Sequence, residues 1–463
     1  MKKIICLMLT ILLAFGTLPL TVSAVGANYN LSYQLNSDGS GYIVTGCTDD
    51  WGADVEIPAT YKGKPVVEIG SNVMATERFS TLYIPESVKK INLGLHPYSS
   101  LASISVNSNN KYYSSANGVL FNKKKTELLM YPGEKADKSY TIPSSVTKIH
   151  SSAFEGAEFE SIKIPSSVKT IESCAFAYAG KLKSVSLPDG IKTIPDECFY
   201  NCYSLSKVKL PSNLSKIEYF AFVNCGLKSI SIPKSVTSIG KMAVGYTSYP
   251  DGDKKVPGFK IQGASGSVAQ QYAKSNGFAF TVVKVPAKTT LKSIKNVSGG
   301  VTITWNKVSG ADSYIVYRKS GKSNWKAIKT GVTSTSYTDK TAKSGTAYTY
   351  TVRAVNIAGK GGYDSKGLAI KYLAVPSLKI ISSAKSGVTF KWNKVTGASG
   401  YYVYRKTGNG GWKRIATVKG NSKVSYLDKS AKKGATYTYT VRAYSGKTLS
   451  SYNTKGLKIK DKY

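Results

Sequence analysis

Carboxylates, histidines and cysteines are the side chains that could carry hydrolytic or metal chemistry. This 463-residue sequence offers 26 Asp plus Glu, two His and six Cys. No Glu follows Glu218, so a hydrolytic pair in the second half would have to use Asp at turn-like positions such as Asp339 and Asp428. Asp251-Gly252-Asp253 lacks the further spaced ligands of a calcium loop and is interpreted as a plain turn. The sequence has no phosphate loop, CxxC pair or nucleophile elbow, so we expect neither an enzyme nor a bound cofactor or metal.

The two histidines are interpreted as structural. His96 lies eleven residues after Pro85, a slot that the repeats described below fill with Phe. His150 lies at a turn and has no carboxylate or Cys partner in phase with it. A Cys-His nucleophile pair with Cys174 is weakened by the neighbouring Ala-Phe, which predicts a buried thiol.

Two tryptophans with basic neighbours are the candidate ligand-contact residues: Trp325 with Lys326, and Trp412 with Lys413 and Arg414. They occupy matching positions in two similar modules. A flat indole can stack on a sugar or a base, and it can equally be a packing residue of its module. The basic residues are scattered along predicted strands and no nucleic-acid-binding fold is recognised, so specific nucleic-acid binding is not expected.

Repeats organise the middle of the chain. An apolar residue followed by Pro recurs at intervals of 22 or 23 residues, with Ile six and Phe or Val eleven residues after each Pro. The prolines are Pro143, Pro165, Pro188, Pro211 and Pro233, and the aromatic slots are Phe154, Phe176, Phe199, Phe222 and Val244. Each unit predicts two short strands and a tight segment that turns the Phe inward. One unit cannot bury its apolar face alone, so the units must stack as a solenoid.

The pattern continues more loosely on both sides. It is present upstream at Ile57-Pro58 and Ile84-Pro85, and residues 117–132 predict an inserted β-hairpin. Downstream, residues 259–261 predict a final strand, and residues 265–276 an amphipathic helix that caps the solenoid. Cys202 and Cys225 fall in the same phase of neighbouring repeats, which permits either a disulfide or two buried thiols.

The motif I-P-x-S-V-x-x-I-x-x-x-A-F-x-x-C resembles the BspA-type leucine-rich repeat of bacteria. The resemblance covers residues 28–284 and is most specific over 142–244. It implies an exported surface protein, since members of this family are typically surface proteins and several resemble adhesins.

The C-terminal part contains two modules of about 88 residues. Residues 301–308 return as 388–395 with Trp392 in place of Trp305, and residues 348–354 return identically as 437–443. Alternation in the latter stretch predicts a half-buried antiparallel strand. The modules, at 286–372 and 374–461, resemble fibronectin type III domains, and the resemblance implies that Tyr348 and Tyr437 are the tyrosine corners. Neither contains Arg-Gly-Asp, so integrin binding is not implied.

The N-terminus predicts export. Lys2 and Lys3 precede an apolar run over residues 4–20, and small residues follow up to Ala24. This is the pattern of a signal peptide over residues 1–24. The apolar run is short for a retained anchor, and no later run could span a bilayer, so we expect a secreted chain without a transmembrane segment.

Positive charge is concentrated in the two modules. Residues 285–463 hold 34 Lys plus Arg and five Asp, which is +29 of the net +38. Such a surface attracts phosphates and carboxylates, so an anionic cell-wall polymer is a candidate partner. Lys that merely solubilises the surface is the alternative.

The sequence therefore predicts a mostly β protein with a leucine-rich repeat solenoid followed by two immunoglobulin-like, fibronectin type III β-sandwiches. The expected function is non-catalytic binding of a protein or glycan on a host or neighbouring cell, with the modules as spacer or wall anchor. The alternative is a carbohydrate-binding accessory component of an extracellular polysaccharide-degrading system. A wall protein without a specific ligand is a third possibility.

Overall fold

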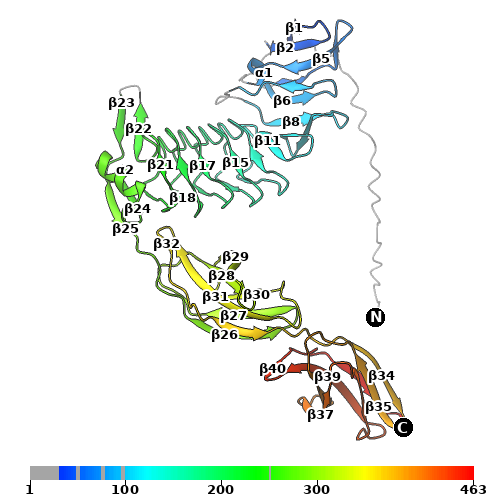
Figure 1. The fold of residues 1–463 in the computed structure, drawn as a ribbon. Helices are drawn as coiled ribbons and strands as arrows, with labels where there is room; N and C mark the ends of the chain where they lie inside the picture. The colour runs from blue at the N-terminus through cyan, green and yellow to red at the C-terminus, as the bar shows by residue number, and fades with distance from the viewer. Residues whose placement is uncertain (1–30, 48–52, 75–78, 95–99, 250–251) are drawn as a thin grey trace, which may run out of the picture.

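The computed structural model describes residues 31–47, 53–74, 79–94, 100–249 and 252–463, and the described chain is almost entirely β (Figure 1). The predicted signal peptide and His96 lie outside these residues. A curved solenoid leads into two elongated modules that follow one another toward the C-terminus.

The repeats form a solenoid in which each unit adds one strand to a parallel sheet on either side. One sheet contains β12 (Ser139–Thr141), β14 (Ser161–Lys163), β16 (Ser184–Ser186) and β18 (Lys207–Lys209). The other side contains β13 (Lys148–Ile149), β15 (Thr170–Ile171), β17 (Thr193–Ile194), β19 (Lys216–Ile217) and β21 (Ser238–Ile239). Register follows the sequence repeat, because Ile149 pairs with Ile171, and Ile217 pairs with Ile239.

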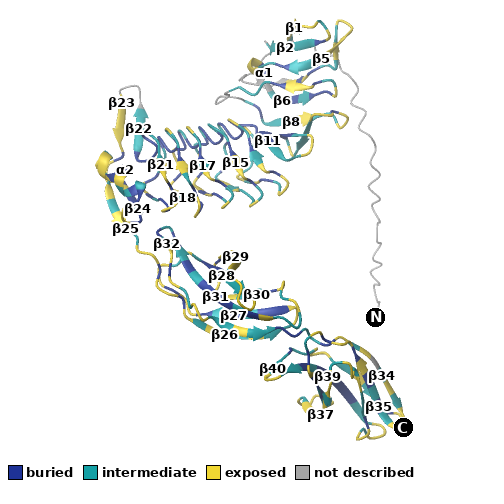
Figure 2. Ribbon diagram, in the orientation of Figure 1, coloured by how far each residue is buried: buried dark blue, intermediate teal, exposed yellow. Residues whose placement is uncertain are grey.

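The predicted inward phenylalanines form a continuous stack. Ring centroids are 4.9 Å apart between Phe154 and Phe176, 5.1 Å between Phe176 and Phe199, and 5.1 Å between Phe199 and Phe222. The planes differ by only 6–9°. This spacing is close to the distance of roughly 4.8 Å between neighbouring strands. The same coil-to-coil distance therefore allows both the backbone hydrogen bonds and the ring contacts to form. Figure 2 shows the resulting buried interior.

The first part of the solenoid is less regular and contains a predicted hairpin. One sheet contains β1 (Leu31–Leu35), β2 (Tyr42–Cys47), β5 (Lys64–Ile69), β4 (Thr60–Tyr61) and β7 (Lys90–Ile91), and α1 (Ser71–Met74) follows β5. A second contains β3 (Ala53–Glu56), β6 (Phe79–Ile84) and β8 (Ser103–Val106). The hairpin comprises β10 (Val119–Asn122) and β11 (Glu127–Met130), with β9 (Tyr113–Ala116) on the far side of β10. Strand β11 pairs in parallel with β13, so the insertion joins the regular sheet.

A helix and a small sheet close the other end, as predicted. The sheet contains β20 (Ser229–Ser231), β24 (Lys260–Gly263) and β25 (Ala279–Val282), and a hairpin of β22 (Tyr246–Tyr249) and β23 (Gly252–Lys255) lies beside it. Helix α2 (Val268–Asn276) has Ser267 as N-cap and Gly277, with φ of 68°, as C-cap. Its buried residues Ala269, Tyr272 and Ala273 cover the last coil.

Each C-terminal module is a sandwich of two antiparallel sheets. The first contains β26 (Leu291–Val297), β27 (Gly300–Trp305) and β30 (Ser336–Asp339) against β29 (Lys326–Val332), β28 (Ser313–Lys319), β31 (Ala347–Asn356), β32 (Gly359–Lys360) and β33 (Leu368–Lys371). The second repeats this order with β34 (Leu378–Ala384), β35 (Gly387–Trp392) and β38 (Ser425–Asp428) against β37 (Lys413–Lys419), β36 (Gly400–Thr407), β39 (Thr436–Ser445), β40 (Thr448–Leu449) and β41 (Leu457–Lys460). Trp305 and Trp392 lie in the two cores.

The tyrosine corners implied by the resemblance are present. The backbone N–H of Lys343 donates to the Tyr348 hydroxyl at 3.1 Å, and Lys432 N–H donates to Tyr437 at 3.1 Å. In both modules the tyrosine therefore fixes the loop five residues upstream.

The open question of a Cys202–Cys225 disulfide is resolved in favour of free thiols. None of the five cysteines of the described chain forms a disulfide. The Sγ of Cys202 lies 3.1 Å from the Phe176 carbonyl, and that of Cys225 lies 3.1 Å from the Phe199 carbonyl. Each thiol thus contacts the preceding coil and packs as a small apolar group.

The two modules meet without a spacer. Asn296 Nδ2 donates to the carbonyls of Lys371 and Leu449 at 3.0 and 3.1 Å, and the Ser344 hydroxyl donates to the Thr396 carbonyl at 2.9 Å. Gly345 and Gly397 contact each other across the junction, and a Cβ on Gly397 would collide with the Gly345 Cα. The junction therefore has a defined geometry.

We predict that Phe199→Ala destabilises the solenoid by about 3–5 kcal/mol, because it opens a cavity in the stack and removes two ring contacts. The measurement is urea unfolding of the full chain followed by circular dichroism. Tyr203→Ala, in the same coil but with Tyr203 57% exposed, is the control and should cost less than about 1 kcal/mol. Equal losses in the two variants would contradict the role of the stack.

We predict that Gly397→Ala bends or loosens the module junction. Gly310 is the matching position in the first module; its φ of 70° is close to the 81° of Gly397, and its surroundings are open. Gly310→Ala therefore imposes similar backbone strain without the collision and is the control. Small-angle X-ray scattering should show a changed maximum dimension in Gly397→Ala alone; identical profiles would rule out a tight junction.

Candidate binding surfaces

Each module has a buried carboxylate that joins three of its segments; the second module also buries Asp461, which accepts a hydrogen bond from the Ser383 hydroxyl. Asp339, at the end of β30, accepts hydrogen bonds from Arg318 Nη1 at 2.6 Å and the Tyr350 hydroxyl at 2.8 Å. Its other oxygen accepts from the N–H and hydroxyl of Thr341, at 2.9 and 2.7 Å. These bonds satisfy the carboxylate as a buried ion pair, so it does not form the two-carboxylate arrangement of a hydrolase.

The second module repeats this arrangement. Asp428 accepts from Arg405 Nη1 at 2.7 Å, from the Tyr439 hydroxyl at 2.7 Å, and from the N–H and hydroxyl of Ser430 at 3.0 and 2.7 Å. Desolvation by burial acts to raise the pKa of Asp339 and Asp428. The hydrogen bonds of Thr341, Tyr350 and Arg318, and of their counterparts, outweigh it and hold both pKa values below the ordinary range.

The predicted ligand-contact residue Trp325 is half-buried on the outer face of the larger sheet. Lys319 Nζ lies 4.8 Å from its ring centroid, and Tyr363 meets it edge-on at 6.4 Å. Gly367 lies against the indole, since a Cβ there would lie 3.0 Å from Cη2. A small cavity of about 130 Å³ lies beside the ring. Trp325 therefore already has a cation and a neighbouring aromatic as partners.

Trp412 has the same surroundings in the second module. Lys406 Nζ lies 5.2 Å from its ring centroid, Tyr452 meets it edge-on at 6.2 Å, and Gly456 packs against the indole. The repetition in both modules is consistent with the packing alternative that the sequence left open. Their role as ligand contacts stays a prediction.

The basic members of the predicted set lie on edge strands. Lys326 begins β29 and Lys413 begins β37, each at the edge of its sheet, and both side chains are exposed. Exposed Arg414 lies 4.7 Å from the Tyr402 ring centroid. Charged edge strands discourage pairing with another sheet, so these residues have a structural use even without a ligand.

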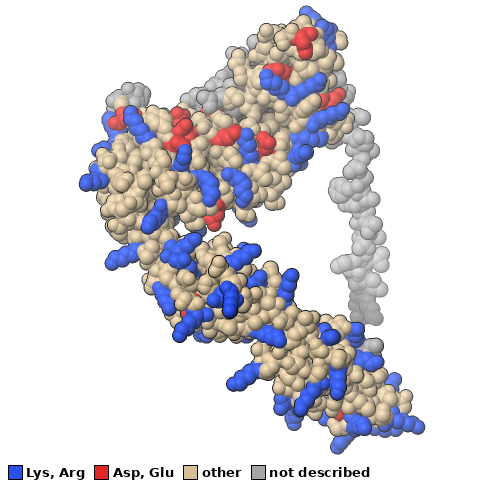
Figure 3. Space-filling view, in the orientation of Figure 1, with Lys and Arg blue, Asp and Glu red and all other residues tan. Residues whose placement is uncertain are grey.

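Charge differs between the solenoid and the modules. Figure 3 shows Asp and Glu on the visible face of the solenoid among Lys and Arg, whereas the charged side chains visible on the modules are nearly all Lys and Arg. The Asp339 and Asp428 carboxylates are buried in ion pairs, so they leave the surface lysines uncompensated. The modules consequently present a basic surface.

The prediction that His150 has no carboxylate partner is wrong. Its Nε2 lies 3.3 Å from Glu127 and its Nδ1 lies 3.3 Å from Glu172, on the coils before and after it. The 22-residue spacing to Glu172 matches the repeat and could have revealed that partner. Glu127 lies 23 residues before His150, again at the repeat spacing, but the pattern was interpreted there as an inserted hairpin and not as a coil of the repeat.

This cluster does not contain a nucleophile. The Cys174 thiol lies 3.8 Å from Glu197 rather than on His150, and desolvation and the Glu197 charge raise its pKa to about 12. Burial acts to raise the pKa of Glu172, but the Lys148 hydrogen bond and the His150 charge hold it below the ordinary value. The cluster is therefore an ion-pair network between coils.

Within the described ranges, no group of three or more His, Cys, Asp or Glu is arranged to hold a metal. In the same ranges, every helix is too short or too polar to cross a membrane.

We predict that module stability falls in acid below about pH 4, the pKa of Asp in unfolded chains. The lowered pKa values of Asp339 and Asp428 mean that their contribution is complete above this pH and is lost as pH falls through the folded-state values. Urea unfolding monitored by tryptophan fluorescence between pH 7 and 2 measures this loss. Asp339→Asn with Asp428→Asn should be less stable at pH 7, by about 3–5 kcal/mol for each module, and should lose less on acidification.

Asp364→Asn is the control, because the Asp364 carboxylate only accepts the nearby Lys366 N–H at 3.0 Å. It should leave the acid dependence unchanged. An unchanged dependence in the double variant as well would assign acid unfolding to other groups.

Comparison with known proteins supports both parts of this architecture. The model of the BspA type leucine rich repeat region matches residues 134–249 with six copies. Fibronectin type III domain-containing protein 7 of Mus musculus is 27% identical over 157 residues, which is 33% of this chain and 20% of that protein. The chain therefore spans about a fifth of that relative's length.

An enzyme and a solved structure are also similar over part of the chain. Exoglucanase B of Cellulomonas fimi is 33% identical over 164 residues, which is 31% of this chain but 13% of the enzyme. A leucine-rich repeat protein from Eubacterium ventriosum is 28% identical, with 43% of this chain and 69% of that one covered at a TM-score of 0.31.

The repeat spacing, the two module sandwiches with their tyrosine corners, and the matched family agree with the resemblances seen in the sequence. The chain contains a BspA-type leucine-rich repeat region over residues 134–249 and continues into two modules of the fibronectin type III kind.

Proposed function

We propose that this chain is a non-catalytic surface protein whose solenoid binds a partner on another cell while its two basic modules hold it at an anionic cell wall. The observation that carries the proposal is the division of charge, with +29 of the net +38 in residues 285–463. Export by the predicted signal peptide, an adhesin-like role and retention at the wall are parts of this proposal.

The geometry supports this division of roles. The solenoid presents repeated exposed side chains on extended sheets, which suits a broad protein or glycan partner. The modules are joined by fixed hydrogen bonds, so they can act as a spacer of defined length. Their surface lysines attract phosphate or carboxylate polymers without requiring a shaped site.

The carbohydrate-binding alternative draws on the partial similarity to an exoglucanase and on the twin tryptophan clusters. Lys319 and Lys406 already lie over the two indole rings, so a sugar that stacked there would have to displace them. This arrangement favours the wall-retention proposal for the modules.

We predict that the full chain binds isolated Gram-positive walls and is released by salt, because raising salt from about 0.15 to 1 M shortens the Debye length from about 8 to 3 Å. Replacing Lys326, Lys329, Lys413 and Lys419 by Gln should weaken wall binding by up to about a thousandfold, since each of the four removed charges costs roughly 1 kcal/mol near an anionic surface. Co-sedimentation over a salt series measures both effects.

The matched control replaces four exposed solenoid lysines, Lys192, Lys207, Lys216 and Lys241, by Gln. This variant has the same net charge as the module variant and should retain most of its wall binding. Equal weakening in the two variants would show that total charge matters and not the modules, and binding unaffected by 1 M salt would contradict electrostatic retention.

A further inference from the structure

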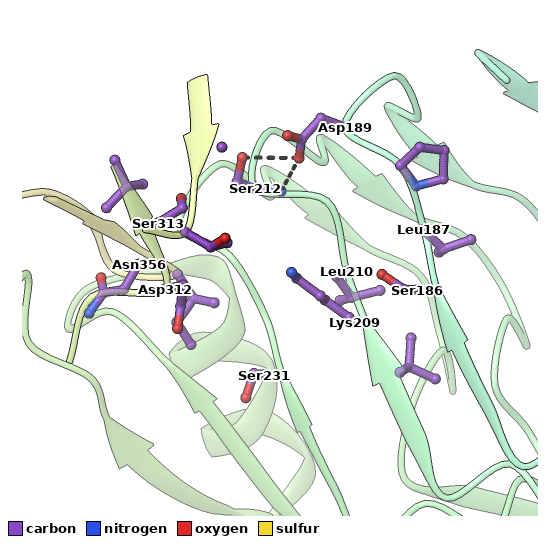
Figure 4. A pocket seen from close by; sticks show the side chains of 16 residues that line it. Ser186, Leu187, Asp189, Lys209, Leu210, Ser212, Ser231, Asp312, Ser313 and Asn356 are labelled. Carbon is purple, nitrogen blue, oxygen red and sulfur yellow. Dashed lines mark hydrogen bonds between the residues drawn. The ribbon is translucent and has the colours of Figure 1, made fainter. Parts of the chain in front are cut away.

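A cavity of about 550 Å³ lies between the solenoid and the first module (Figure 4). Its solenoid wall comes from β16, β18 and the turns after them, and its other wall from the start of β28 and the ends of β29 and β31. A volume of roughly 300–1,000 Å³ at a domain boundary is typical of ligand sites. We call this space the junction cleft.

Fixed contacts shape the junction cleft before any ligand enters. Lys234 N–H on the solenoid donates to the Ile357 carbonyl of the module at 2.7 Å. The buried Asn356 side chain donates to the carbonyls of Lys284, in the connecting segment, and Gly310, at 2.8 and 3.0 Å. The solenoid, the connection and the module are thereby tied together around the cleft, so ligand binding would not have to order them.

The polar lining combines several kinds of group. Asp189 and Asp312 contribute carboxylates from opposite walls, and Lys209 contributes an ammonium group. Hydroxyls come from Ser212, Ser313 and Thr333 among others, and Figure 4 shows Ser212 bonded to Asp189, to which its N–H and hydroxyl both donate at 3.3 Å.

These groups select for a ligand that both donates and accepts hydrogen bonds. Carboxylates only accept, an ammonium only donates, and serine and threonine hydroxyls do both. The two carboxylates outnumber the one ammonium, so the lining has a net charge of −1 and disfavours a phosphate or sulfate; a bare cation would use Asp189 and Asp312 but leave Lys209 and the hydroxyl donors without a partner. Sugar hydroxyls can pair with all three kinds without net charge, and the half-buried Val208 and Ile357 offer apolar contact to the C–H faces of a sugar ring.

We infer that the junction cleft binds a segment of a neutral oligosaccharide, with Asp189, Lys209 and Asp312 directing its hydroxyls. This inference deepens the proposed function and rests on it, since it gives the surface protein a glycan partner. It also places glycan recognition at the first module's contact with the solenoid, away from Trp325 and Trp412.

The experiment applies the full chain to an array of immobilised neutral, sialylated and sulfated glycans, and then measures affinity for the best neutral tetrasaccharide by calorimetry. Thr333→Trp places a large side chain at an exposed wall position of the cleft, and Asp312→Ala removes one carboxylate. Each should lower affinity about tenfold or more. Ser422→Trp, at an exposed position after β37 in the second module, is the control and should stay within about twofold.

Binding of neutral glycans that the two cleft variants lose and the control keeps would support the inference. An array with no neutral glycan bound, or neutral binding that both cleft variants retain, would overturn it. If Thr333→Trp fails to fold, as judged by circular dichroism, Asp312→Ala decides the question alone. Salt-sensitive wall binding of the same preparations tests the proposed function separately, so the loss of one does not imply the loss of the other.

Discussion

A shared pitch between parallel strands and stacked phenylalanines is the constraint on which the solenoid depends. The rings of Phe154, Phe176, Phe199 and Phe222 repeat at 4.9–5.1 Å, which the hydrogen-bonded ladders on either side also require. A coil with one residue too many in the wrong place would lose both contacts at once. Because each coil is covered only by its neighbours, helix α2 and the first strands are needed to close the ends.

The two modules are stabilised differently from the solenoid. Their sandwiches have apolar cores, yet each includes a carboxylate, Asp339 or Asp428, held by an arginine, a tyrosine and a turn. Each carboxylate connects the end of one strand to an arginine and a tyrosine on two strands of the facing sheet, so removing it would leave a half-buried arginine without its partner. The pairs also remove two of the few acids from the surface, which strengthens the basic character of the modules.

Structural features that follow from the sequence repeats were predicted correctly. Contacts between segments that do not resemble each other in sequence were missed. The phase of Phe and Ile predicted the stack and the strand register, and the duplicated Tyr348 and Tyr437 predicted both tyrosine corners. The Glu127 partner of His150 lies at the repeat spacing of 23 residues but was missed because its segment lacks the Ile-Pro and Phe of the repeat and was interpreted as an inserted hairpin. The junction cleft was missed because its walls are about 80 or more residues apart in sequence, and no local pattern encodes how the first module lies against the solenoid.

The thiols packed between the coils have a chemical consequence. Burial raises the pKa values of Cys198, Cys202 and Cys225, so very little thiolate, the species that attacks disulfides, is present at neutral pH. Once the coils have closed, these residues neither exchange with disulfides in the surroundings nor pair with one another. The folded repeat thereby lowers the reactivity of these three thiols, and a disulfide between them is not needed to achieve this.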